Sequence, residues 1–163
     1  MQNVCLNDAV ISSTGIAKLI NLKVKTEITP REYTDLGCYR SDGIIIATPT
    51  GSTAYSMAAG GPILDPEMEA LIINPICPFT LSNRPMVLPS RQAVLVTVEK
   101  EQRSSVLLTV DGQDTFELRG GDEIVMCQNP HYAGIITSGR GSYYSALLGK
   151  LSRGGASKGG DCA

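Results

Sequence analysis

Alternating apolar and polar residues dominate the chain, and the clearest example is LINLKVKTEI at residues 19–28. Its apolar side chains recur at every second position, while lysine and glutamate side chains occupy the positions between them. This period of two is typical of a β-strand with one buried and one solvated face. The predicted buried positions are Ile20, Leu22, Val24 and Ile28.

Similar patterns predict most of the remaining chain to be strand. The run Ile44-Ile45-Ile46 is one such segment, and further strands are predicted at residues 69–76, 93–100, 105–112, 114–118, 120–128 and 133–138. The strand at 69–76 is predicted to be ended by Pro75 and Pro78. Asp111-Gly112 separates two of these segments, and Asp-Gly between β-rich segments is a strong hairpin signal. We therefore predict a mainly β domain, most economically a two-sheet β-sandwich with one or two short helices.

Only two segments have helical patterns. Residues 52–60, STAYSMAAG, predict two helical turns with Ser52 or Thr53 as N-cap and Gly60 as the stop. Residues 141–151 predict a short amphipathic helix near the end of the domain, for which we expect mobility or contacts in an oligomer. The Gly/Ser-rich residues 152–163 are predicted to be a disordered tail, so the domain is assigned to residues 1–151.

Composition narrows the functional classes. The formal net charge is −2, which gives no electrostatic case for nucleic acid or an anionic membrane, and no apolar run is long enough to span a bilayer. The five cysteines are scattered without a C-x-x-C pair, and His131 is the only histidine. A zinc site and a disulfide framework are therefore disfavoured, and we expect a cytoplasmic protein with reduced thiols.

The turn after the isoleucine run is the first candidate site. Residues 48–53, TPTGST, contain four hydroxyl side chains in six positions, with Pro49 and Gly51 shaping the backbone. Unpaired N–H groups at a following helix start would suit an anion or a ligand with hydroxyls and a ring. The alternative is an ordinary turn followed by a capped helix.

Other polar residues have two interpretations each. Asp42 and Arg40 precede the isoleucine run, where a carboxylate either accepts from a ligand hydroxyl or caps a turn. Asn7 and Asp8 interrupt an apolar segment, so they are either structural or face a ligand. Gln113, after the Asp-Gly pair, is on pattern alone a turn residue.

Several motifs together resemble the NAD kinase family. They are RSDGIIIATPTGSTAYSMAAGGPILDP, PICPFTLSNRPMVLP and LLTVDGQ, and the resemblance extends in order from LND at residue 6 to about residue 151. The resemblance implies phosphoryl transfer from ATP, or in some members polyphosphate, to the 2′-hydroxyl of the adenosine ribose of NAD. It also implies Mg²⁺ on the donor phosphates and a base that takes the hydroxyl proton.

One family motif is missing from this sequence. NAD kinases have an N-terminal α/β domain with Gly-Gly-Asp-Gly-Thr, whose aspartate is the catalytic base, and this motif does not occur here. The resemblance is therefore to the C-terminal domain only. We expect the N-terminal domain to be absent and the isolated chain to be inactive, and we assign no catalytic residue or metal ligand to it.

The resemblance implies an NAD-binding set at matching positions. Asn7 and Asp8 match an Asn-acid pair, Asp42 an aspartate at the nicotinamide end, and Ala58 replaces a serine of relatives. The complete set is Asn7, Asp8, Lys18, Arg40, Asp42, Thr50, Thr53, Ala54, Tyr55, Ser56, Met57, Ala58 and Gln113. Family members are homo-oligomers in which a neighbouring subunit completes the site, so we expect a dimer or tetramer.

Three hypotheses remain open at this stage. The chain is the NAD-binding and oligomerising domain of an NAD kinase, or it is a non-catalytic NAD-binding or oligomerisation module. The third is a structural β-sandwich that kept the motifs and lost the function. The first two differ in whether the missing base is supplied from elsewhere.

Overall fold

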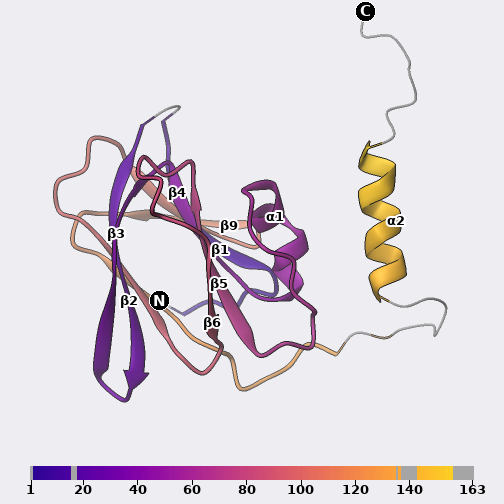
Figure 1. The fold of residues 1–163 in the computed structure, drawn as a ribbon. Coiled ribbons are helices and arrows are strands. Elements are labelled where there is room, and N and C mark those ends of the chain that lie inside the picture. The colour runs from indigo at the N-terminus through magenta and orange to yellow at the C-terminus, as the bar shows by residue number, and fades with distance from the viewer. Residues whose placement is uncertain (1, 16–17, 135, 137–142, 156–163) are drawn as a thin grey trace, which may run out of the picture. The chain divides into compact units, whose positions relative to one another are not determined.

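The chain is represented by a computed structural model, which describes residues 2–15, 18–134, 136 and 143–155 (Figure 1). Contacts divide the chain into two units, residues 1–131 and 132–163. The strands of the described residues all lie in the first unit, and the second contains helix α2 (Tyr143–Gly155).

Helix α2 confirms the helix predicted near the C-terminus, although it starts later and extends to Gly155. The ring centroids of Tyr143 and Tyr144 are 5.4 Å apart in an edge-to-face arrangement. Of the strand predicted at 133–138, residues 133, 134 and 136 are not in a strand, and the other three lie outside the described residues. The predicted tail at 152–163 is wrong for residues 152–155, which belong to α2, and its remaining residues lie outside the described residues. No helix in the described ranges is long and apolar enough to cross a membrane.

The first unit consists of two antiparallel sheets, which confirms the mainly β two-sheet prediction (Figure 1). The six-stranded sheet has the order β6 (Met86–Pro89), β5 (Ala70–Ile76), β4 (Gly43–Ala47), β1 (Asp8–Ser13), β8 (Val106–Val110) and β9 (Asp114–Leu118). The four-stranded sheet has the order β10 (Glu123–Met126), β7 (Val94–Val98), β2 (Ile20–Thr29) and β3 (Glu32–Ser41).

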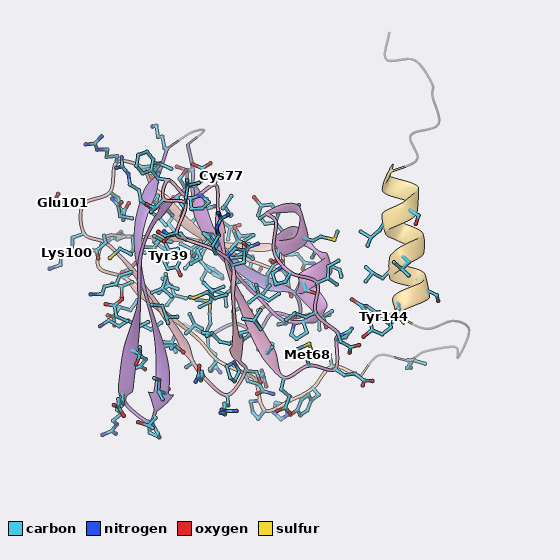
Figure 2. The ribbon with its side chains drawn as sticks, in the orientation of Figure 1. Tyr39, Met68, Cys77, Lys100, Glu101 and Tyr144 are labelled. Atoms are coloured by element: carbon cyan, nitrogen blue, oxygen red, sulfur yellow. The ribbon has the colours of Figure 1, made fainter. Side chains whose placement is uncertain are left out.

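The main core lies between the sheets and consists of the alternating apolar residues predicted from the sequence. From the six-stranded sheet it includes Ile11, Ile44, Ile46, Leu71 and Ile73, and from the other Ile20, Leu22, Val24, Val94, Val96 and Val98. Tyr39 of β3 also points into this core (Figure 2). Burial of these side chains is the main force that holds the sheets together.

A second apolar cluster lies on the outer face of the six-stranded sheet. It contains Val10 of β1, Ile45 of β4 and Ile72 of β5, packed with Leu64. Strand β4 is thus buried on both faces, which explains its uninterrupted isoleucine run. The segment that covers this outer face includes helix α1, on the side of the sheet away from β2 and β3 (Figure 1).

The covering segment forms one 3₁₀ turn, η1 (Thr50–Thr53), followed by the short helix α1 (Tyr55–Ala58). The predicted N-cap is wrong, because neither helix has a side-chain cap; the Ser52 hydroxyl instead accepts the Leu64 N–H at 3.0 Å. The predicted stop at Gly60 is confirmed. Its φ of 80° and the bonds from the N–H groups of Gly60 and Gly61 to carbonyls of α1 form a Schellman motif.

Two details of the strand predictions are wrong. Ile28 is 54% exposed, because it lies near the end of the β2–β3 hairpin, beyond Thr26, where the pairing of β2 with β7 ends. Pro75 lies within β5 rather than ending it. Strand β6 pairs with β5 only up to Ile73, so the edge beside Pro75 has no neighbour that needs its missing N–H.

Candidate functional site

A cleft of about 390 Å³ opens on the outer face of the six-stranded sheet, beside the cover formed by η1 and α1. Alternate residues of β1 form its floor, since Asp8, Val10 and Ser12 point to the same side of the strand. The complete lining is Asn7, Asp8, Val10, Ser12, Ala54, Tyr55, Thr109, Asp111 and Gly112. The cleft therefore joins three segments that are distant in sequence.

Hydrogen bonds from Thr48 hold the loop before β1 against the turn after β4. The Thr48 N–H donates to the Asn7 carbonyl at 2.9 Å, and the Thr48 hydroxyl donates to the Leu6 carbonyl at 2.6 Å. The same hydroxyl accepts the Gly51 N–H at 3.1 Å. One threonine thus connects both segments, and its hydroxyl is used for structure rather than for a ligand.

Gly51 is required by the close approach of these segments. A Cβ at this position would fall far inside contact distance of the backbone of Asn7. Because the obstacle is backbone rather than a flexible side chain, a small shift cannot relieve it. Gly51 therefore sets how closely η1 lies to the loop that presents Asn7.

The third segment is the β8–β9 turn, where the Asp111 carboxylate accepts three backbone N–H groups. Its Oδ2 accepts Leu6 N–H at 2.7 Å, and its Oδ1 accepts Asn7 N–H at 2.7 Å and Asp8 N–H at 3.1 Å. In return, the Asp111 N–H donates to the Asp8 carbonyl at 3.0 Å. Asp111 and Gly112 have φ of 48° and 68°, which confirms the Asp-Gly hairpin.

Asp8 and Asp111 place two carboxyl groups in the lining of the cleft, near enough for one to affect the other. Burial raises the pKa of Asp8, which is 5% exposed, and the nearby Asp111 carboxylate raises it further. Burial also raises the pKa of the Cys5 thiol, with additional contributions from Asp111 and Asp8. Cys5 is therefore held as a thiol and is a poor nucleophile.

Three predicted residues, Lys18, Arg40 and Asp42, lie at the other end of the β1–β4 pair and do not line the cleft. We call them the far-end cluster. Asp42 precedes β4 and Thr48 follows it, a separation of roughly 20 Å at ~3.4 Å per residue. The Arg40 guanidinium lies 4.9 Å from the centroid of the Phe79 ring.

The other predicted residues fall into two groups. Four line the cleft: Asn7, Asp8, Ala54 and Tyr55. Six belong to the covering segment or the β8–β9 turn but do not line the cleft: Thr50, Thr53, Ser56, Met57, Ala58 and Gln113. Of these, Ser56 is fully buried and accepts hydrogen bonds from the Asn74 side chain, so its role here is structural.

Five lining residues were not identified from the sequence as site residues: Val10, Ser12, Thr109, Asp111 and Gly112. The period of two could have placed Val10 and Ser12 beside Asp8. No local pattern indicates that Asp111 contacts residues more than 100 positions earlier, since the Asp-Gly pair predicts only a turn.

A second hollow, of about 890 Å³, borders Arg40 and the loop after β7. Its charged residues have both signs, and Lys100 and Glu101 are exposed and project outward (Figure 2). We do not assign a site to it. In the described ranges no group of three or more His, Cys, Asp or Glu side chains is placed to bind a metal ion.

Comparison with a family model gives a match over most of the chain. Residues 6–138 match the model of the ATP-NAD kinase C-terminal domain. The NAD kinase of Treponema denticola is 43% identical over 152 residues, which cover 93% of this chain and 52% of that protein. The NAD kinase of Aquifex aeolicus is 44% identical over 146 residues, covering 90% and 51%. The chain spans about half the length of these curated relatives.

Solved structures of two related kinases superpose on this chain. An NAD kinase from Archaeoglobus fulgidus in complex with ATP superposes with a TM-score of 0.76 at 28% identity, covering 91% of this chain and 54% of that chain. Yeast NADH kinase complexed with NADH gives a TM-score of 0.66 at 36% identity, covering 74% and 33%.

Proposed function

The chain belongs to the ATP-NAD kinase C-terminal domain family, and on this basis we propose that it supplies the NAD-binding half of an NAD kinase. That enzyme transfers a phosphoryl group from ATP to the 2′-hydroxyl of the adenosine ribose of NAD and forms NADP. The proposal extends to this chain what the names of its relatives say of them.

The observation that carries the proposal is the convergence of three distant segments on one cleft. Residues 6–8, 48–55 and 111–112 meet there through hydrogen bonds between backbone and side chains. A structural β-sandwich would not need a cleft between these segments, which are also the ones that match the family motifs. This favours a binding domain over the structural alternative.

The cleft has the chemistry that adenosine needs. Tyr55 is 49% exposed and offers an aromatic ring at the wall. Asn7 and Asp8 in the lining offer groups that can bind ribose hydroxyls. We propose that the adenine packs against Tyr55 and that the ribose faces Asn7 and Asp8.

We propose that catalysis also requires groups outside these 163 residues. The sequence has no Gly-Gly-Asp-Gly-Thr, the motif whose aspartate is the base that the resemblance implies. Loss of a general base alone lowers rates by about 10²–10⁴. We therefore propose that this chain binds NAD and that the base and the phosphate contacts belong to the other half of the enzyme.

We also propose that a second copy of the chain completes the NAD site. Lys18, Arg40 and Asp42 lie roughly 20 Å along β4 from the cleft. Within the described residues their side chains have no hydrogen bond or ion pair, which leaves their charges available to a ligand bound by a neighbouring copy.

A calorimetric titration of the chain with NAD tests the binding proposal. We expect saturable binding that Asp42→Ala weakens and that Lys158→Ala in the C-terminal tail leaves unchanged. Equal effects of the two substitutions would contradict the assignment of Asp42. In an NADP-forming assay with ATP we expect negligible turnover. A rate near that of a full-length enzyme would contradict the proposal that the base and the phosphate contacts lie outside this chain.

Mixed oligomers test the second-copy proposal. Asp8→Ala impairs the cleft and Asp42→Ala impairs the far-end cluster, so each variant alone should bind NAD weakly. If one site uses both copies, mixing the variants under exchange conditions should restore some intact sites. Recovery of tight binding in the mixture, together with an oligomer in sedimentation, supports the proposal; additive loss without recovery contradicts it.

A further inference from the structure

We propose that Asp111 is the positioning residue of the cleft, because its carboxylate holds the backbone of residues 6–8 in the conformation that presents Asn7 and Asp8. The inference rests on the proposed function for its link to NAD affinity. Asp111 itself acts through the loop rather than on the ligand.

The geometry supports a positioning role over direct ligand contact. Both carboxylate oxygens of Asp111 are engaged, one with the N–H of Leu6 and the other with the N–H groups of Asn7 and Asp8. Hydrogen bonds to an ionised carboxylate are roughly twice as strong as neutral ones. Three such bonds on one side chain define the loop's position relative to the β8–β9 turn.

The rest of the loop has few other tethers. Thr48 binds the carbonyl groups of Leu6 and Asn7, but among the described residues only Asp111 binds the three consecutive N–H groups of residues 6–8. Removing the carboxylate would leave these three donors to water. Asn7 and Asp8 would then sample several positions in the cleft.

The backbone conformation of Asp111 allows a clean test. Its φ of 48° lies in the left-handed region, which glycine and asparagine adopt readily. Asp111→Gly therefore removes the carboxylate and preserves the turn, and Asp111→Asn preserves the side-chain shape and one acceptor oxygen. The matched control is Glu117→Gln, an exposed carboxylate on β9 that does not line the cleft and makes no hydrogen bond or ion pair within the described residues.

Two measurements on the whole chain separate the roles. Amide hydrogen exchange followed by NMR reports the three N–H groups directly, with the amides of Val24 and Val96 in the core as internal references. We expect exchange at Asn7 and Asp8 to accelerate about tenfold to hundredfold in Asp111→Gly, less in Asp111→Asn and not in Glu117→Gln. The dissociation constant for NAD should rise in the same order, by about tenfold or more in Asp111→Gly.

Each outcome decides the inference. Faster exchange at residues 6–8 with unchanged core amides and weaker NAD binding supports it. Unchanged exchange at residues 6–8 overturns it, and so does unchanged NAD affinity in a variant whose loop exchanges faster. If the unsubstituted chain binds no NAD, the proposed function fails, and the exchange measurement alone decides whether Asp111 holds the loop.

Discussion

The two ends of the β1–β4 strand pair differ in how their functional candidates are held. At the cleft end, Thr48, Gly51 and Asp111 fix the loop of residues 6–8 through hydrogen bonds and a close backbone approach. At the far end, the backbone is also anchored, since Ser13 N–H donates to the Asp42 carbonyl at 3.0 Å. The far-end side chains, however, make no hydrogen bond or ion pair within the described residues, where Arg40 contacts the Phe79 ring.

The cleft is therefore a pre-formed site, whereas the far-end cluster is a set of charged side chains that are not yet held in place. Because the cleft residues are already ordered in the folded chain, ligand binding there costs less free energy for ordering them. The far-end side chains must still be ordered by a ligand or a second copy. We therefore expect substitutions at the cleft end to change stability and affinity together, and those at the far end to change affinity alone.

The largest effect is expected from Gly51→Ala at the cleft end. The added Cβ would meet the Asn7 backbone, and neither η1 nor the loop can move without breaking the Thr48 bonds. We expect the free energy of unfolding to fall by about 3 kcal/mol or more, measured by urea denaturation. Gly134→Ala is the matched control, because a Cβ there meets no atom within 4 Å. Equal urea midpoints for Gly51→Ala and Gly134→Ala would contradict the close approach of Gly51 to the Asn7 backbone.

A smaller effect is expected from Asn74→Ala, beneath α1. Asn74 is fully buried, and its Nδ2 donates to the Ser56 carbonyl at 2.9 Å, which secures the helix that begins at Tyr55. Loss of this donor should destabilise the fold by about 1–3 kcal/mol. The far-end counterpart is Asn83→Ala, whose exposed amide makes one long bond to Cys38; we expect a change within about 0.5 kcal/mol in chemical denaturation.

Sequence reasoning predicts the parts of this molecule that depend on local periodicity. The alternation of Ile20, Leu22 and Val24 correctly predicts a buried strand face, and Asp111-Gly112 correctly predicts a hairpin. The same alternation is wrong at Ile28, because burial there depends on how far β7 extends.

Local patterns do not predict the contacts between distant segments in the site. The triple contact of Asp111 with residues 6–8 joins positions over 100 residues apart, so only the strand order β4-β1-β8 creates it. Local spacing predicts Ser52 or Thr53 as an N-cap and cannot indicate that the Ser52 hydroxyl accepts the N–H of Leu64, twelve residues later. The motif resemblance places ligand positions at both ends of the predicted strand at 44–46, but it does not indicate which end lines the cleft.

The pH dependence of stability gives a third way to test the cleft end. The pKa of Asp8 is raised above its ordinary value of 3.8, first by burial and then by Asp111. The folded protein therefore binds this proton more tightly than the unfolded chain, so stability decreases as the pH rises from about 3.8 through the raised pKa. Asp8→Asn should remove this decrease.

In urea denaturation, Asp8→Asn should be more stable than the unsubstituted chain at neutral pH and should lose this advantage at about pH 3, where Asp8 is protonated in both states. Asp111→Gly should weaken the same pH dependence, because it removes the second cause of the shift. Parallel pH profiles for Asp8→Asn and the unsubstituted chain would contradict a buried Asp8.

The smallest effect is expected from the contact between Arg40 and Phe79. Phe79 is 68% exposed, and a cation–π contact at such a site contributes about 0.5–1 kcal/mol. A double-mutant cycle of Arg40→Ala and Phe79→Ala, measured by urea denaturation without ligand, should give a coupling energy in or below this range. A coupling of several kcal/mol would mean that the far end is as firmly ordered as the cleft. A small coupling that grows when NAD or a second copy binds would show that the far-end charges are ordered only on association.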